Sequence, residues 1–371
     1  MTRRRSYEHL DESDVRVRPG RRGSRPRSKD RPAHADAVIG RVVRVDRGRF
    51  TVVVDGVTVM AMKARELGRR SVVVGDEVAL VGDVSGTEGS LARIVRSEPR
   101  TTVLRRTADD TDPVERVVVA NVDTMVIVTA LANPEPRPRL VDRCLVAAYD
   151  AGIEPLLLLT KADLADPAAF VAHFAPLGVE TIVSGLAGGT ADTEPPDETD
   201  ADSHDTALEP AALDALRARL AGRASVLVGH SGVGKSTVVN ALVPGLGRAT
   251  GHVNEVTGRG RHTSTSAIAA PMPGGEGGWI VDTPGIRSFG LAHVEPERIV
   301  SLFADLVEGT EGCPRGCSHD EAECGLDEFV ESAEVEEREA LRTRLGSLRR
   351  LLRARRGETD STVIHESPPR P

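Results

Sequence analysis

The chain has 371 residues, of which 39% are hydrophobic and 28% charged, and these proportions predict a globular protein of two or three domains. No uninterrupted apolar run of about 18 residues occurs, and the arginine-rich start lacks the apolar stretch of a signal peptide, so we expect a cytoplasmic protein without a membrane span. The net charge is −8, but residues 1–106 hold 24 basic and 14 acidic residues, so the rest of the chain is strongly acidic. The basic front part predicts a polyanionic partner, with nucleic acid the leading candidate.

The first 106 residues divide into two segments. Residues 1–35 combine eleven basic residues with Pro, Gly and Ser and show no apolar periodicity, which predicts a disordered basic arm. Residues 36–106 contain β-rich runs at 38–45, 50–54, 57–62, 72–81 and 91–95. Five short strands separated by turns predict a small barrel of the OB type. Its arginines could contact nucleic-acid phosphates, or could instead keep the strand edges soluble; they are Arg41, Arg44, Arg47 and Arg49.

Residues 107–292 alternate apolar strand patterns with helical patterns, which predicts an α/β domain with a mostly parallel sheet. The expected strands cover 124–129, 155–159, 181–183, 225–228 and 279–281, and the expected helices cover 140–150 and 237–243. Cys144 lies within the first helical pattern and is interpreted as buried packing. Residues 186–210 are acidic, contain Pro195-Pro196 and predict a disordered insertion.

A glycine-rich loop follows the strand pattern at 225–228. It reads Gly229-His230-Ser231-Gly232-Val233-Gly234-Lys235-Ser236 and matches G-x4-G-K-S. Glycines let the backbone turn its N–H groups toward the phosphates of a nucleoside triphosphate, and the following helix adds a favourable dipole. We expect Lys235 to reach the β- and γ-phosphates and the Ser236 hydroxyl to hold Mg²⁺, with Thr237 also among the nucleotide contacts.

A guanine-reading element is predicted at the end of the second strand pattern, where the chain reads Thr160-Lys161-Ala162-Asp163. A carboxylate at Asp163 would accept from the N1–H and the exocyclic amine of guanine, and adenine offers neither donor in that arrangement. Ser184-Gly185 follows the third strand pattern and is expected to give a backbone contact to the same base.

Two switch segments are predicted after the phosphate loop. The first, residues 258–265, is basic and rich in hydroxyl groups, and Thr263 or Thr265 is expected to complete the Mg²⁺ shell. The second is Asp282-Thr283-Pro284-Gly285, a D-x-x-G pattern in which Asp282 would lie near Mg²⁺ through water and the Gly285 N–H would sense the γ-phosphate.

The C-terminal part, residues 293–358, contains a candidate metal site, and residues 359–371 are expected to form a disordered tail. Three thiols and one imidazole satisfy tetrahedral Zn²⁺, and these groups are Cys313, Cys317, His319 and Cys324. One structural Zn²⁺ per chain is therefore predicted within a helical module. A helix beyond the site carries a leucine stripe and seven arginines between 342 and 356, which could touch rRNA or could pack within the protein.

The order of the nucleotide motifs is permuted. In Ras-like GTPases the phosphate loop precedes D-x-x-G and the base reader comes last, whereas here residues 160–163 precede residues 229–236. A circular permutation explains this order because all of these loops project from one edge of one sheet.

With a barrel before the GTPase motifs and a cysteine-histidine module after them, the chain resembles the circularly permuted GTPases of the ribosome small-subunit-dependent GTPase A family from about Val38 onward. The resemblance implies hydrolysis of GTP to GDP and phosphate, stimulated by the small ribosomal subunit during its late maturation, with rRNA as a contact. Ras-like enzymes place a water-orienting Gln where this chain has Ile286, and the resemblance suggests His262 as the catalytic substitute. The chain departs from the usual pattern at Thr160, where GTPases commonly have Asn, and at Gly185, where Ala is commoner.

Two other functions are compatible with parts of this pattern. One is a nucleic-acid-binding regulator whose nucleotide site is mainly structural, and the other is a P-loop ATPase or kinase. Measurable turnover would separate the first from a GTPase, and the base preference would separate the second. We expect a monomer that binds no membrane.

Overall fold

The computed structural model describes residues 34, 36–67, 72–107, 114–185, 208–244, 267–274, 277–283 and 290–357. The predicted basic arm, most of the acidic insertion, the C-terminal tail and the first switch segment lie outside these residues. Among the described helices, none is both long enough and apolar enough to cross a bilayer.

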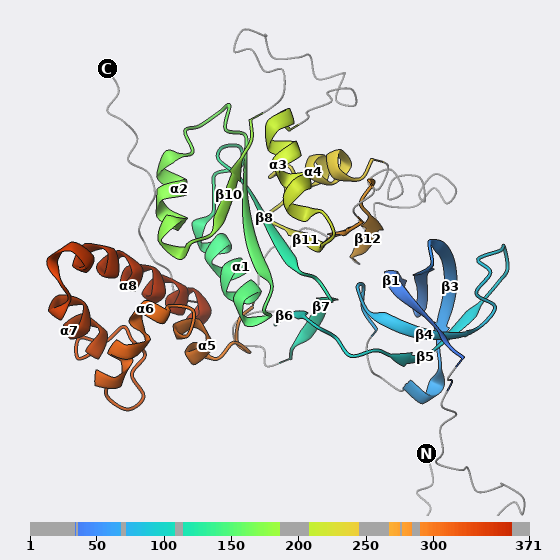
Figure 1. Ribbon diagram of the computed structural model, residues 1–371, viewed down its shortest axis with the longest axis horizontal. Coiled ribbons are helices and arrows are strands. Elements are labelled where there is room, and N and C mark those ends of the chain that lie inside the picture. Colours follow the sequence, from blue (N-terminus) through green and yellow to red (C-terminus); the bar gives the residue numbers. More distant parts are fainter. Residues whose placement is uncertain are drawn as a thin grey trace, which may run out of the picture. The chain divides into compact units, whose positions relative to one another are not determined.

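Five short strands form a barrel-like sheet at the start of the described chain (Figure 1). They are β1 (Val38–Asp46), β2 (Arg49–Val54), β3 (Val57–Lys63), β4 (Glu77–Gly82) and β5 (Ala92–Ser97), with a short 3-10 helix at Arg65–Leu67. The strands pair in the order β1-β2-β3-β5-β4, and β4 also pairs with β1, which closes the ring. Alternate residues point inward to an aliphatic core that includes Val42, Val52 and Ile94.

The fourth strand begins later than its apolar pattern suggests. The run starts at Val72, but β4 starts at Glu77, because Gly75 has a φ of +90° and turns the backbone. The buried Asp76 carboxylate stabilises this turn by accepting from the Val73 N–H at 2.8 Å and from the Arg100 guanidinium at 2.6 and 2.8 Å.

A two-stranded antiparallel ladder connects the barrel to the main sheet, and the sequence pattern did not predict it. Its strands are β6 (Val103–Arg106) and β7 (Arg116–Ala120). The end of β7 bonds to the Gly75 turn, since the Ala120 N–H donates to the Val74 carbonyl at 3.1 Å and the Asn121 side chain donates to the Gly75 carbonyl at 2.9 Å. Non-local bonds of this kind leave no periodicity in the sequence.

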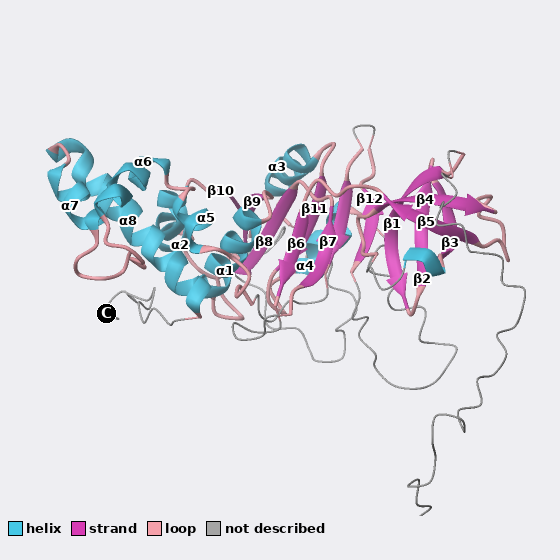
Figure 2. Cartoon of the chain, turned by 90° about the horizontal axis from the view of Figure 1, so that it is seen from below, coloured by secondary structure: helices cyan, strands magenta, loops and turns pink. Residues whose placement is uncertain are grey.

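The main sheet runs in the order β10-β9-β8-β11-β13-β12 (Figure 2). Its strands are β8 (Thr124–Ala130), β9 (Glu154–Thr160), β10 (Glu180–Val183), β11 (Ala224–Val228), β12 (Ile268–Pro271) and β13 (Trp279–Asp282). All of these pairings are parallel except that of β12 with β13, so the predicted mostly parallel sheet is confirmed. Strand β12 also pairs with β1 of the barrel through Arg44 and Ile268.

Helices cover both faces of the main sheet. Helices α1 (Pro138–Asp150) and α2 (Ala168–Phe174) pack on one face, and α3 (Pro210–Leu220) and α4 (Lys235–Leu242) pack on the other. Near-continuous apolar strands are expected in a sheet that is buried on both faces. Cys144 of α1 is buried in the first of these cores, as its position in the helical pattern indicated.

The C-terminal helices join the core on the α1 side of the sheet. They are α5 (Pro296–Val300), α6 (Ala304–Val307), a 3-10 turn at Glu308–Gly312, α7 (Gly325–Ser332) and α8 (Val335–Arg356). The leucine stripe of α8 is buried at Leu345, Leu348 and Leu352, together with Leu351. Packing on a shared core therefore accounts for the apolar face of this helix.

The Gly75 turn provides a test of the joint between barrel and sheet. A Cβ on Gly75 would lie 1.9 Å from the Ala120 carbonyl oxygen. We expect Gly75→Ala to destabilise the protein by at least about 3 kcal/mol, because steric overlap adds to left-handed backbone strain. Gly48→Ala is the matched control, since Gly48 has a φ of +86° and open space around it. The control should cost only about 1 kcal/mol. Thermal unfolding of both variants measures this difference, and equal losses would contradict the role of the turn.

Candidate nucleotide site and metal centre

The phosphate loop connects β11 to α4 and requires glycine at three positions. Gly229, Gly232 and Gly234 have φ values of +154°, +84° and +92°. A Cβ on Gly229 would also lie 2.3 Å from the Val128 carbonyl oxygen of the neighbouring strand. The loop can therefore adopt this conformation only because these residues lack side chains.

Lys235 is the first residue of α4, and its side chain reaches back to this loop. Its Nζ donates to the carbonyls of Gly229 and His230, both at 2.8 Å, and the side chain is buried. Burial lowers the pKa of Lys235, and the nearby Asp282 carboxylate partly offsets this shift. Burial likewise raises the pKa of Asp282, with Lys235 acting in the opposite direction. The ammonium is thus partly desolvated, which favours binding of an anionic group such as a phosphate.

The predicted base-reading loop is bonded to the phosphate loop. The Thr160 hydroxyl donates to the Val233 carbonyl at 2.8 Å, and the Lys161 ammonium donates to the Gly232 carbonyl at 3.1 Å and to the Asn133 carbonyl. Threonine at position 160 therefore retains a hydroxyl that ties the two loops together, although the usual carboxamide is absent.

The Ser184-Gly185 element lies beside the same loop. The Ala162 N–H donates to the Ser184 carbonyl at 3.2 Å, and the Ser184 N–H donates to the Leu159 carbonyl at 2.8 Å. A Cβ on Gly185 would lie 3.4 Å from Asp163 Oδ1 and 2.8 Å from Glu209 Oε1. The glycine leaves room for the Glu209 carboxylate at this position, which gives a physical reason for the departure from Ser-Ala.

The second switch begins at the end of β13. Asp282 pairs in register with Leu227 of β11, and the buried Thr283 hydroxyl donates to the Leu227 carbonyl at 2.7 Å. Ser236 and Thr237 lie in the first turn of α4, the helix that follows the phosphate loop. His262, Thr263, Thr265 and Gly285 lie outside the described residues, so their expected roles stay predictions.

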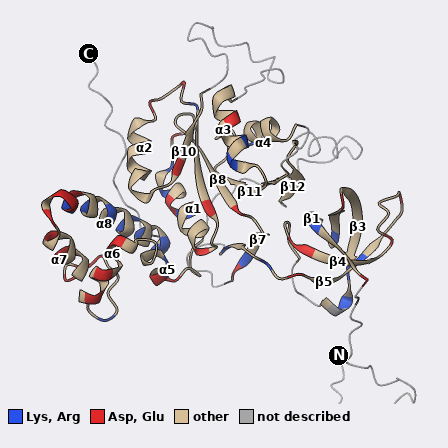
Figure 3. Cartoon of the chain, viewed as in Figure 1, with Lys and Arg blue, Asp and Glu red and all other residues tan. Residues whose placement is uncertain are grey.

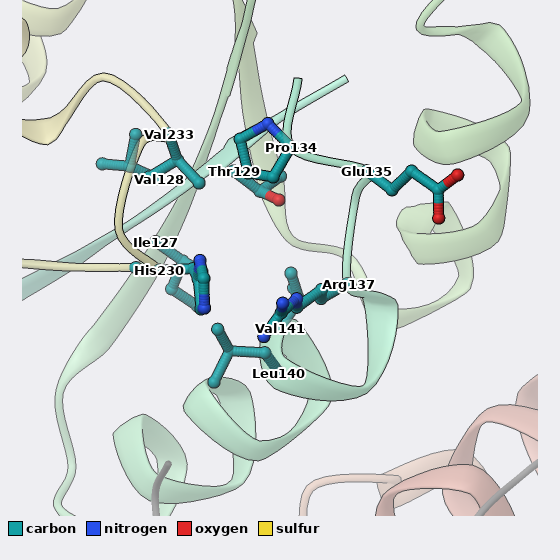
Figure 4. A pocket seen from close by; sticks show the side chains of 11 residues that line it. Ile127, Val128, Thr129, Pro134, Glu135, Arg137, Leu140, Val141, His230 and Val233 are labelled. Carbon is teal, nitrogen blue, oxygen red and sulfur yellow. The ribbon is translucent and has the colours of Figure 1, made fainter. Parts of the chain in front are cut away.

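A small cavity lies beside the phosphate loop, and no sequence pattern predicted it (Figure 4). His230 and Val233 of the loop line it, together with Thr129 of β8 and Leu140 and Val141 of α1. Its remaining walls are Ile127, Val128, Pro134, Glu135, Arg137 and Gly229. Helix α1 therefore contacts the same cavity as the phosphate loop.

The four predicted metal ligands converge. The ligand atoms of Cys313, Cys317, His319 and Cys324 all lie within 4.8 Å of one another. The Cys313 Sγ lies 3.5 Å from His319 Nδ1 and 3.9 Å from Cys324 Sγ, and the Cys324 Sγ lies 4.0 Å from His319 Nδ1. Adjacent ligands of tetrahedral Zn²⁺ are separated by about 3.5–3.8 Å when the Zn–S distance is about 2.3 Å. The donor set and its spacing fit a metal ion of this kind.

The arginines of α8 are all bonded within the protein, and Figure 3 shows basic residues along this helix with acidic residues on α6 and α7 beside it. Arg344 binds Asp305, Arg349 binds Asp327, and Arg350 binds Asp142 of α1. Arg353 and Arg356 bind Asp320, Arg342 binds Glu331, and Arg355 donates to the Val294 carbonyl. Of the two roles that the sequence left open, internal packing is the one these contacts support.

The family model and the relatives that match this chain carry the same description. A family model described as RsgA GTPase matches residues 97–190 and 201–292. A small ribosomal subunit biogenesis GTPase RsgA from Pseudomonas aeruginosa is 39% identical over 298 residues, which span 78% of this chain and 77% of the relative. A protein of the same name from Gemmatimonas aurantiaca is 35% identical over 277 residues, with 74% and 83% covered.

Two solved structures share the fold. YjeQ from Thermotoga maritima aligns with a TM-score of 0.56 and 25% identity over 85% of this chain and 98% of that chain. YloQ, described as a circularly permuted GTPase, aligns with a TM-score of 0.52 and 19% identity over 86% of this chain and 98% of that chain. The permuted order of the motifs is therefore a property of a known fold.

The bond between Thr160 and Val233 can be tested by substitution. We expect Thr160→Val to weaken GDP binding about tenfold, because the Val233 carbonyl loses its donor and the two loops are no longer joined there. Thr160→Ser keeps the hydroxyl and should bind GDP like the wild type. Fluorescence titration with a labelled GDP measures both affinities, and a Thr160→Val variant that binds GDP as tightly as the wild type would contradict the role of this hydrogen bond.

Proposed function

Because the chain belongs to the RsgA GTPase family, we propose that it hydrolyses GTP to GDP and phosphate and that the small ribosomal subunit stimulates this reaction during late subunit maturation. The observation that carries the nucleotide assignment is the junction of two loops at one sheet edge. Thr160 and Lys161 of the base-reading loop both bond to carbonyls of the phosphate loop. A ligand with a base at one end and phosphates at the other would contact both loops at once.

The chain's own groups define how the nucleotide would be held. Asp163 and the backbone at Ser184-Gly185 would contact guanine, while residues 229–237 would surround the phosphates. Lys235 would exchange its two carbonyl partners for phosphate oxygens, which are better acceptors for an ammonium. The hydroxyl of Ser236, one of Thr263 and Thr265, and Asp282 through water would hold Mg²⁺, which would neutralise phosphate charge during hydrolysis.

The first switch would complete the catalytic site. Ile286 cannot orient water, so His262 would take this role once the segment around it adopts its working conformation. Docking on the small subunit would order that segment, and Gly285 would report the presence of the γ-phosphate through its N–H. Intrinsic hydrolysis would accordingly be slow, and hydrolysis would release the protein from its partner.

The flanking parts are proposed to bind the partner. The arm and an OB-type barrel would contact rRNA through basic side chains, and Arg44, Arg47 and Arg49 are partly or fully exposed on β1, β2 and their turn. One structural Zn²⁺ held by three cysteines and His319 would order the C-terminal module. The protein would act as a monomer, and it would meet this partner in the cytoplasm.

Stimulation by the partner is the direct test. GTP turnover should rise at least about tenfold when purified small ribosomal subunits are added at fixed salt, because the partner lowers the barrier by ordering the first switch. Phosphate release is measured with small subunits, with large subunits and with neither. Equal rates in the three reactions would contradict partner-completed catalysis.

The His262→Ala variant refines the same measurement. It should turn over GTP at the unstimulated rate even with small subunits present, while its GDP affinity stays within about twofold of the wild type. Loss of nucleotide binding would instead make His262 a structural residue.

The base preference is tested at Asp163. We expect Asp163→Asn to weaken GTP binding about 10- to 100-fold and to favour xanthine nucleotides, because the amide donates where the carboxylate accepts. Asp166→Asn is the matched control, because Asp166 is exposed just beyond the same loop and the substitution removes the same charge. An ATPase or kinase site would show no gain of xanthine binding in Asp163→Asn.

A further inference from the structure

Helix α8 lies against the segment that carries the predicted metal ligands. Its Arg349 Nε donates to the His319 backbone carbonyl at 2.7 Å, and the two Nη atoms of the same guanidinium bind Asp327 of α7 at 2.9 and 2.7 Å. One arginine therefore bonds to the backbone of one ligand, His319, and to α7, the helix that begins directly after another ligand, Cys324.

A second contact holds the residue next to His319. Arg353 binds the Asp320 carboxylate with two bonds of 2.8 and 2.6 Å, and Arg356 adds a third bond to it at 2.9 Å. Both side chains are partly shielded from water, with exposures of 34% for Arg353 and 18% for Asp320. Paired, partly buried guanidinium–carboxylate bonds fix geometry more firmly than exposed ion pairs do.

The ligand segment, residues 313–324, combines an unusual backbone conformation with local hydrogen bonds. His319 has a φ of +63°, a left-handed backbone that non-glycine residues rarely adopt. Within the segment, the Ser318 N–H donates to the Glu321 carboxylate and the His319 N–H donates to Cys317 Sγ. Of the four ligands, only Cys324 is fully buried. The Arg349 and Arg353 bonds join this locally bonded segment to α8 at His319 and at Asp320.

We propose that Arg349 and Arg353 are positioning residues for the metal, holding His319 and Asp320 of the ligand segment in the binding conformation. This inference rests on the Zn²⁺ centre of the proposed function. Three thiolates and a neutral imidazole around Zn²⁺ carry one net negative charge, so two adjacent guanidinium groups also favour the loaded centre electrostatically. Partners that orient metal ligands typically contribute 10- to 100-fold to metal affinity.

The experiment measures Zn²⁺ affinity of the full chain by competition with a chromogenic chelator, and the Co²⁺ absorption spectrum as a probe of tetrahedral ligation. Arg349→Gln and Arg353→Gln should each weaken Zn²⁺ binding about tenfold or more. Arg342→Gln is the matched control, because Arg342 lies on the same helix and binds Glu331 with comparable geometry, away from the metal ligands. Its Zn²⁺ affinity should equal that of the wild type.

Asp320→Asn removes the Arg353 bonds from the other side. Because Asp320 also accepts from Arg356, we expect it to weaken Zn²⁺ binding at least as much as Arg353→Gln does, and adding Arg353→Gln to Asp320→Asn should weaken binding little further. If an arginine variant fails to fold, Asp320→Asn and the remaining arginine variant decide the question. Unchanged Zn²⁺ affinity in them, with the wild type binding one Zn²⁺, overturns the positioning role, and reduced small-subunit binding in the same variants would assign the arginines to the partner surface. A wild type that binds no Zn²⁺ would refute the metal centre itself.

Discussion

The parallel register of β9, β8 and β11 is the constraint on which the nucleotide site depends. Ala130 pairs with Thr160, and Ile127 pairs with Val228, so β9 and β11 end at the same edge of the sheet with β8 between them. The loops that follow them are then close enough for Thr160 to bond to Val233. Because proximity comes from strand pairing and not from chain order, a permuted sequence can assemble the same site.

The electrostatics of the loop follow from that geometry. Lys235 begins the helix after the phosphate loop, and its ammonium group donates to two backbone carbonyls of that loop. Burial in the loop lowers the pKa of this side chain. Asp282 lies at the end of the adjacent strand β13, and burial raises its pKa. The desolvated Lys235 ammonium is better stabilised when an anionic group arrives, because that group provides the counter-charge that water no longer does.

Those parts of the fold that have a local pattern could be predicted from the sequence. The apolar runs of β8, β9 and β11 and the glycine loop after β11 are encoded within a few residues, and their strands lie where the pattern indicates. Features that depend on distant partners could not be predicted, such as the pairing of β6 with β7 or the start of β4 after the Gly75 turn. The α8 arginines show this limit most clearly: their spacing suits an RNA surface equally well, and only the positions of Asp142, Asp320 and Asp327 settle which groups they bind.

Those same contacts make the C-terminal helices part of the sheet's core. Arg350 forms a buried ion pair with Asp142, and Arg143 donates to the Ala354 carbonyl at 2.5 Å, so α8 is bonded to α1 at both charged and backbone groups. One apolar cluster contains Cys324 beside the ligand segment, Leu348 of α8, Val141 of α1 and Val228 before the phosphate loop. A packed interior transmits displacement because it has little free volume. The contacts of α8 with the ligand segment and of α1 with the phosphate-loop cavity therefore share one continuous packed core.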